Sequence, residues 1–272
     1  MEKVGLIIKY RLTKYKLKND FLSRVKGKNM SLNIKEAFLY PFGDREWKTK
    51  LVIPALIAAL PAIYKVTQQE LDIIPRIFFT FIIAVLSLLY FGFILEYMRN
   101  QLNETNINKL PNIVADYKKF IINAIKCILV CAVYTLLLII PSALVFFGFK
   151  VGTNVFFISI LMACILIFLY FLILFYAQLV FIENYSFEEA LNISKIFKLI
   201  ISSKWLTLST FLIINCTSGV FSVLELLLKR FVISIIPLAC IETICSLFIV
   251  SISVQTYKLT KKNLKTEVIA QS

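Results

Sequence analysis

Six apolar runs separated by polar segments set the organisation of the chain. A bilayer core about 30 Å thick needs roughly 20 predominantly apolar residues per helix, and the later five runs meet that length. The first run is shorter and contains Pro54 and Pro61, so a kinked or re-entrant segment is the alternative to a crossing. The runs cover residues 51–66, 73–98, 121–149, 154–182, 204–228 and 231–257. This pattern predicts an all-α fold, a polytopic membrane bundle of about six transmembrane helices with cytoplasmic amphipathic helices.

The basic residues are divided unevenly between the two sides of such a bundle. If the runs cross in turn, only five of the 30 Lys and Arg residues lie on the side opposite the termini. Cytoplasmic loops retain the excess of positive charge, so we expect an even number of crossings, cytoplasmic N- and C-termini, and a location in the cell membrane. The five exceptions are Lys65, Arg76, Lys150, Lys229 and Arg230.

The composition excludes several classes of protein. Charged residues make up 17% of the chain and hydrophobic residues 59%, against roughly 25% charged in soluble domains, so a soluble globular protein is excluded. The net charge is +14, but long apolar runs separate the basic residues, so they do not form the uniform basic surface of a nucleic-acid-binding protein. Anionic lipid is therefore the expected partner. Histidine, the commonest general base and zinc ligand, is absent. All six cysteines, including Cys127 and Cys131 one helical turn apart, lie within the predicted spans and are expected to pack as small apolar groups. We therefore expect no metal and no cofactor.

Two polar stretches run into a span through a tryptophan, one over residues 33–47 and one over 185–205. Trp47 and Trp205 are expected to anchor the chain at the headgroup level of the membrane. In the second stretch, Ser186 and Glu189 form a capping box that begins an amphipathic helix. One face of this helix is expected to contact the membrane or the bundle through Phe187, Ala190, Leu191, Ser194, Phe197 and Leu199.

The first stretch also carries a motif of a known family. It reads Asn33-Ile34-Lys35-Glu36-Ala37-Phe38, then Pro41-Phe42, then Asp44-x-x-Trp47. This motif resembles the opening of the multi-pass prokaryotic membrane family named domain of unknown function 4013. Two later segments are similar to that family as well: Phe91-Gly92-Phe93 with Arg99 and Leu110-Pro111, and Glu189-Ala190 to Trp205. The resemblance covers about residues 31–260 and is distantly shared by the membrane domain attached to some glycerophosphodiester phosphodiesterases. It implies six spans and no established activity.

Glu242 is the ionisable residue that stands out within a span. It lies eleven residues after Phe231, or roughly 16 Å along a helix, which predicts a position near the bilayer midplane. Asn215 on the preceding span is expected at comparable depth, and we predict an Asn215–Glu242 hydrogen bond. Two interpretations stay open: Glu242 binds a proton or cation beside a polar seam that includes Ser218, or it is a protonated link between helices. The seam would comprise Thr217, Ser218 and Ser222.

Other polar or small residues have simpler interpretations. Asp44 and Glu46 are expected to form a solvated turn, and Gly148-x-x-x-Gly152 a turn between two spans rather than a dimerisation motif. Glu225, one turn before Lys229, is expected to form an ordinary surface pair. The phosphate-binding loops, nucleophile elbows and clustered carboxylates of enzymes are missing from the sequence, so no catalytic residue is assigned.

These observations divide the chain into a basic, amphipathic N-terminal arm (1–30), a six-span membrane domain (31–258) and a basic cytoplasmic tail (259–272). The alternatives for the arm are a disordered basic tail and an upstream extension that precedes a working start at Met30. We expect an integral membrane protein that is not an enzyme, acting as an accessory, scaffold or envelope component. Its partners would be anionic membrane lipids on the cytoplasmic side, a membrane protein or a second copy of the chain. The first alternative is a small-solute or ion transporter or channel that uses Glu242. The second is a membrane enzyme, which would need a polar site that the sequence does not display.

Overall fold

The computed structural model describes residues 32–44, 46–67, 72–103, 110–203, 205–228 and 235–271. The predicted arm, residues 1–30, lies outside these ranges. Within them the chain forms helices and no strands, which confirms the all-α prediction. The long helices are α3 (Trp47–Thr67), α4 (Ile73–Asn103), α5 (Ile113–Thr135), α6 (Ile139–Val151), α7 (Thr153–Asn184), α10 (Trp205–Leu228) and α11 (Ile235–Gln271). The short ones are α2 (Ile34–Leu39), α8 (Phe187–Leu191) and α9 (Ile193–Ser203), with the 3₁₀ segments η1 (Pro41–Gly43) and η3 (Leu136–Leu138).

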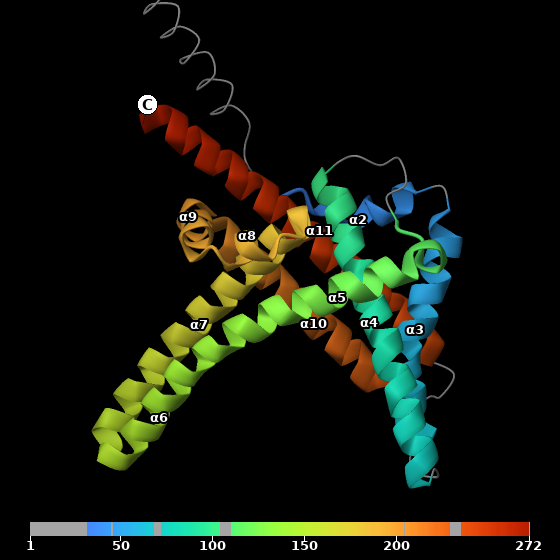
Figure 1. The fold of residues 1–272 in the computed structure, drawn as a ribbon, viewed down its shortest axis with the longest axis horizontal. Helices are drawn as coiled ribbons and strands as arrows, with labels where there is room; N and C mark the ends of the chain where they lie inside the picture. Colours follow the sequence, from blue (N-terminus) through green and yellow to red (C-terminus); the bar gives the residue numbers. More distant parts are fainter. Residues whose placement is uncertain are drawn as a thin grey trace, which may run out of the picture. The chain divides into compact units, whose positions relative to one another are not determined.

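Six segments of the described chain are long and apolar enough to cross a membrane, which confirms the prediction of a multi-pass membrane protein. The weakest of them, α3, remains helical through Pro54 and Pro61. Its 21 residues extend roughly 32 Å, enough to cross the hydrocarbon core. Figure 1 shows α2, α8 and α9 at the end of the helices opposite the α6–α7 turn. We call the end with α2, α8 and α9 the proximal end, and the end where α3 and α10 finish the distal end.

The third span bends at η3, between α5 and α6. Pro141 has no N–H to donate to the carbonyl of Leu137, and proline within a helix also crowds the preceding turn. The Ser142 hydroxyl donates to the Leu138 carbonyl at 2.8 Å and so occupies a second carbonyl next to the break. The span begins at Ile113 rather than at residue 121, because Asn112 caps it by accepting from the N–H of Val114 at 3.1 Å.

Two glycines mark places where the backbone requires them. Gly152 ends α6 with φ +140°, a conformation that L side chains rarely adopt, which confirms the predicted turn between the third and fourth spans. Gly92 of α4 lies against α5, where a Cβ would approach the carbonyl oxygen of Phe120 to 2.2 Å. The two helices therefore pack backbone against backbone at this point.

The amphipathic helix predicted to begin at Ser186 is broken into α8 and α9. Asn192 leaves the helical conformation with ψ 88°, and its side chain caps α9 by accepting from the N–H of Lys195 at 3.0 Å. The break changes which residues of α9 face the bundle, so Ile196 and Leu199 are buried whereas Ser194 and Phe197 are exposed. The predicted single face, which grouped Ser194 and Phe197 with Leu199, is therefore wrong.

Helix α11 joins the other elements, since it contacts α2, α3, α4, α9 and α10. Its 37 residues extend roughly 55 Å, so the segment predicted as a basic tail continues the last span as a helix. Hydroxyl groups link its interior face to its neighbours. Tyr97 bonds to Ser251 at 2.8 Å, and Thr210 bonds to Thr256.

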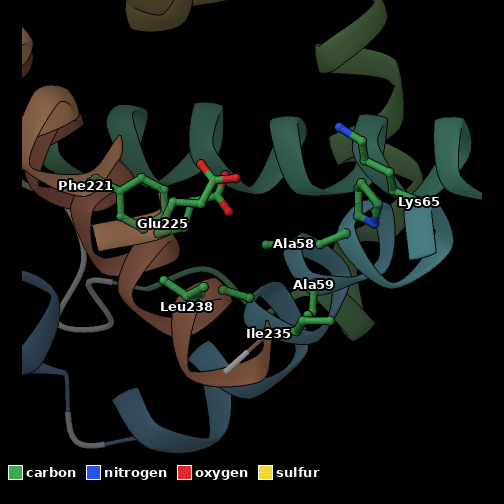
Figure 2. A pocket seen from close by; sticks show the side chains of 11 residues that line it. Ala58, Ala59, Lys65, Phe221, Glu225, Ile235 and Leu238 are labelled. Carbon is green, nitrogen blue, oxygen red and sulfur yellow. The ribbon is translucent and has the colours of Figure 1, made fainter. Parts of the chain in front are cut away.

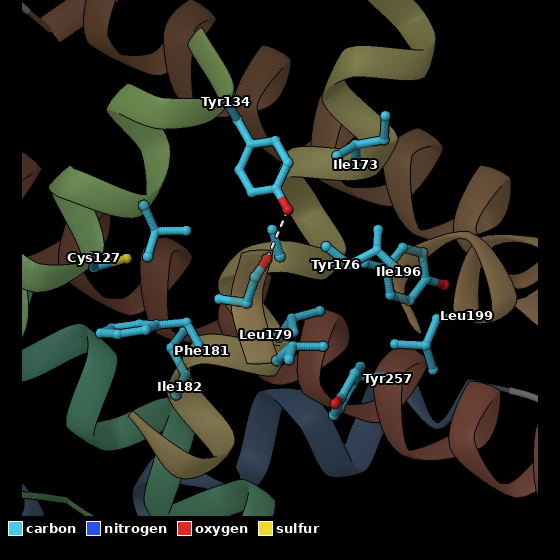
Figure 3. Packing of buried hydrophobic residues seen from close by; sticks show 14 of the residues in the cluster. Cys127, Tyr134, Ile173, Tyr176, Leu179, Phe181, Ile182, Ile196, Leu199 and Tyr257 are labelled. Carbon is cyan, nitrogen blue, oxygen red and sulfur yellow. Dashed lines mark hydrogen bonds between the residues drawn. The ribbon is translucent and has the colours of Figure 1, made fainter. Parts of the chain in front are cut away.

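A large buried cluster centres on α7 (Figure 3). Tyr176 and Phe181 of α7 are fully buried in it, as are Ile196 of α9 and Cys127 of α5. The complete burial of Cys127 agrees with the predicted packing role, and all six cysteines are free thiols. The Tyr134 hydroxyl donates to the Ala190 carbonyl at 2.7 Å and fastens α8 to α5. The short proximal helices are thus held on the ends of the spans.

Candidate functional site

A cavity of about 540 Å³ lies between α3, α10 and α11 near the distal end; we call it the carboxylate cavity (Figure 2). Glu225 of α10 and Glu242 of α11 both line it, together with Lys65 of α3. Small side chains of α3, including Ala58 and Ala59, leave the space open between the helices. In Figure 2 the Glu225 carboxylate and Lys65 lie on opposite sides of that space.

The charged groups of the carboxylate cavity are not paired with one another. Among the described residues, neither Glu225 nor Glu242 has a Lys or Arg nitrogen within 4.0 Å, and Lys65 has no carboxylate that close. Two acids and one base therefore share a space that could hold water, a cation or a small polar solute. Glu225 faces this cavity, and Lys229, its predicted partner, lies outside the described residues.

The structure does not form the predicted Asn215–Glu242 hydrogen bond. The Asn215 amide donates instead to the carbonyl of Phe211 at 2.7 Å, and its side chain is exposed. The residues of the predicted polar seam do not line the carboxylate cavity with Glu242, and two of their hydroxyls donate to a carbonyl of their own helix one turn earlier. Thr217 bonds to Ile213, and Ser222 bonds to the carbonyl of Ser218, whose own side chain is exposed.

The carboxylate cavity lies near the ends of the helices that line it. Lys65 lies two residues before the end of α3, and Glu225 lies three residues before the end of α10. Glu242 is seven residues after Ile235, which lines the same space. The cavity thus reaches the distal ends of the helices. The midplane depth of Glu242 stays a prediction.

At the proximal end Asp44 is buried rather than solvated, with a residue exposure of 3%. Its carboxylate accepts from the N–H groups of Glu46 at 2.9 Å and Leu110 at 3.0 Å, and it pairs with Lys50 at 3.1 Å. Burial by itself raises the pKa of this carboxyl, but the two N–H donors and Lys50 outweigh it and lower the pKa below its ordinary value. The predicted solvated turn is therefore wrong for Asp44. The residue instead ties the start of α3 to the segment that precedes α5.

A second buried carboxylate, Glu96 near the end of α4, was missed by sequence reasoning. It pairs with Lys119 of α5 at 2.7 Å, accepts from the Tyr185 hydroxyl at 2.8 Å, and lies 3.9 Å from Arg99. Tyr185 ends α7 with φ +50°, an uncommon conformation for a residue other than glycine, and its ring lies under Arg99. Burial, followed by the charge of Glu96, raises the pKa of the Tyr185 hydroxyl. The available signal was a carboxylate two residues before the end of the apolar run over residues 73–98.

A polar cavity of about 330 Å³ lies beside these proximal pairs, lined among others by Lys50, Glu96, Asp116 and Lys119. Its acids and bases are largely paired with each other, which favours a structural role over catalysis. Within the described residues no group of three or more Asp, Glu or Cys side chains is placed to hold a metal ion.

The exposed side of α9 carries apolar residues at four-residue intervals; we call it the α9 stripe. It consists of Ile193, Phe197 and Ile201, with exposed fractions of 50%, 37% and 73%. Trp205, the first residue of α10, is 76% exposed. Lys198 lies next to Phe197, is exposed and has no ion pair within the described chain. An exposed apolar stripe with a basic neighbour is typical of a helix that lies at a membrane surface.

The predicted cap of α8 forms in part. Ser186 accepts from the N–H of Glu189 at 3.3 Å, as expected for the N-cap. The Glu189 carboxylate does not return to Ser186; it pairs with Lys195 at 2.6 Å and accepts from Asn184 at 3.2 Å. The Lys195 contact, together with Asn184, lowers the pKa of Glu189. Trp47 and Trp205, the two predicted membrane anchors, differ in their surroundings. The Trp47 ring packs edge to face on the Phe42 ring, with 5.1 Å between ring centroids, whereas Trp205 is exposed.

Comparison with known families identifies this arrangement of helices. The profile of the family described as a protein of unknown function, DUF4013, matches residues 76–238, which is more than half of the chain. The chain belongs to the DUF4013 family. The match runs from α4 into α11 and includes Gly92, Leu110-Pro111 and the segment from Glu189 to Trp205. The opening motif over residues 33–47 lies outside it.

No curated protein matches the chain. No solved structure matches it either. The distant similarity to the membrane domain of glycerophosphodiester phosphodiesterases therefore stays a prediction. Membership of DUF4013 supplies a family without an assigned activity.

Proposed function

We propose that this DUF4013 protein is a non-enzymatic component of the cell membrane, with cytoplasmic termini, that engages anionic lipid through its proximal end. The observation that supports this best is the α9 stripe. Helix α9 connects two candidate spans, α7 and α10, so its exposed apolar side chains are continuous with surfaces that face lipid. A helix joined in this way lies where headgroups and chains meet.

Charge supports the choice of anionic headgroups. Lys198 stands beside the α9 stripe, and the proximal end of α11 carries Lys258, Lys262 and Lys265 as well as Lys261, which pairs with Glu183. Each basic residue near an anionic surface contributes about 1 kcal/mol of attraction, which salt screens over about 10 Å at 0.1 M. The excess of basic residues on the side of the termini favours the cytoplasmic leaflet.

Quenching of Trp205 tests this proposal. In full-length Trp47→Phe protein reconstituted at low salt, brominated phosphatidylglycerol should quench Trp205 at about two- to five-fold lower mole fraction than brominated phosphatidylcholine. Adding Lys198→Gln should reduce the preference, whereas Lys35→Gln, which removes an exposed lysine of α2, should leave it unchanged. Equal quenching by both lipids would overturn the proposal.

The carboxylate cavity supports a second candidate function, transport of a cation or proton. Glu225 and Glu242, on two helices, face one space, and no Lys or Arg nitrogen of the described residues lies within 4.0 Å of either carboxylate. Proteoliposomes containing a trapped pH dye or sodium dye should show flux above protein-free vesicles, and Glu242→Gln should remove most of it. The control Glu46→Gln changes an exposed acid at the proximal end. Flux indifferent to Glu242→Gln would exclude this mechanism.

A further inference from the structure

An apolar groove of about 250 Å³ lies where the bend of the third span, helix α7 and helix α9 meet; we call it the bend groove. The membrane-spanning part of its wall comes from α5, η3, α6 and α7, and its proximal part comes from α9. Its lining residues include Tyr134, Leu137, Ile140, Leu169, Ile193 and Phe197.

The bend of the third span forms the groove. The helix is interrupted at η3 and Pro141, and α6 packs along α7 beyond this point. Leu137 and Ile140 then face α7 across a gap that Leu169 does not fill. Ile140 is exposed, so the groove is accessible from the side, where the bilayer would lie.

The inner wall of the bend groove presents almost no polar group. Two lining residues, Tyr134 and Tyr170, carry a hydroxyl, and that of Tyr134 donates to the Ala190 carbonyl (Figure 3). Polarity begins only at the proximal end, where Ile193 and Phe197 of α9 line the groove and Lys198 follows directly in the chain. Lys195 is already paired with Glu189, whereas Lys198 has no ion pair within the described chain. An apolar slot whose proximal lining residue Phe197 is followed in the chain by an exposed lysine without an ion pair among the described residues matches a chain attached to an anionic headgroup.

We propose that the bend groove binds one acyl chain of an anionic phospholipid, with the phosphate near Lys198. Its volume lies below the roughly 300–1,000 Å³ of typical small-molecule pockets, which fits a chain segment better than a ring-bearing ligand. This inference rests on the proposed lipid engagement and deepens it, because it distinguishes a single bound lipid from general enrichment around α9. The Ile193 and Phe197 side chains belong to both the groove and the α9 stripe and connect the two.

The test uses full-length protein in phosphatidylcholine nanodiscs with a trace of phosphatidylglycerol that carries a diazirine on one acyl chain. Mass spectrometry should find labels on the peptides of η3, α7 and α9 that line the groove. Unlabelled phosphatidylglycerol should compete for this labelling at least about five-fold better than phosphatidylcholine, as one lysine contact predicts. Lys198→Gln should remove that difference, and Lys35→Gln should keep it.

Groove-filling variants make the proposal specific. Leu169→Trp should abolish groove labelling, whereas Leu161→Trp, on an exposed site of the same helix, should not. If Leu169→Trp impairs folding, Ile140→Trp fills the groove from its exposed side. Labelling that resists both variants, or equal competition by the two lipids, would overturn the bound-lipid proposal. Preferential quenching of Trp205 would then still support general lipid engagement, so the two failures are distinguishable.

Discussion

Replacing Asp44 by Ala should lower the free energy of unfolding by about 3–5 kcal/mol, because it leaves a buried Lys50 without its main partner. The substitution also removes the acceptor of the Leu110 and Glu46 N–H groups, and the Leu110 bond joins segments far apart in the sequence. The expected result is a clearly lower Tm during heating in detergent micelles, followed by tryptophan fluorescence. Trp47, three residues away, reports on the same region.

Glu46→Ala is the matched control for Asp44→Ala. The Glu46 side chain is 72% exposed and lies 3.5 Å from the same Lys50, so its loss should cost less than about 1 kcal/mol. Equal effects of the two substitutions would contradict the assigned role of Asp44.

The pH dependence of stability provides a second check on Asp44. The folded pKa of Asp44 is lowered, so its contribution is complete above its unfolded pKa of about 3.9 and is lost as the pH falls through the folded value. The advantage of the wild type over Asp44→Asn should therefore shrink below about pH 4.

Gly92→Ala should destabilise the bundle by about 1–3 kcal/mol or more, because α4 and α5 must separate to admit a methyl group. The Cβ would lie 2.2 Å from the Phe120 oxygen and 2.5 Å from the Phe120 carbonyl carbon, and backbone atoms cannot rotate away as a side chain does. Phe120 is itself fully buried, so its helix has little space into which to move. A lower Tm and a lower yield of monodisperse protein are the expected measurements.

Gly219→Ala controls for the general effect of removing a helical glycine. Gly219 lies within α10, and a Cβ there meets no atom within 4 Å. Alanine should therefore stabilise that helix by up to about 1 kcal/mol. If Gly92→Ala raises the Tm as Gly219→Ala does, the close approach of α4 and α5 is not required for stability.

The positions of the carboxylates separate what can be predicted from a sequence from what cannot. Glu242 is conspicuous in the sequence because it interrupts an apolar run, and the structure places it on a cavity. Its predicted partner Asn215 was wrong because helical rotation decides which residues meet, and equal depth leaves that rotation open. Asp44 stands among charged neighbours and looked solvated, yet Leu110, 66 positions along the chain, covers it.

The sequence by itself determined the number of spans, their approximate limits, the turn at Gly152 and the family resemblance. These follow from local rules, since chain length against membrane thickness and backbone conformation at glycine need no knowledge of distant residues. Only the tertiary structure decided that Asp44 and Glu96 are buried, that α8 and α9 are separate helices, and that a groove opens at η3. Each of these depends on which helix faces meet, and apolar positions all around a membrane helix do not specify its rotation.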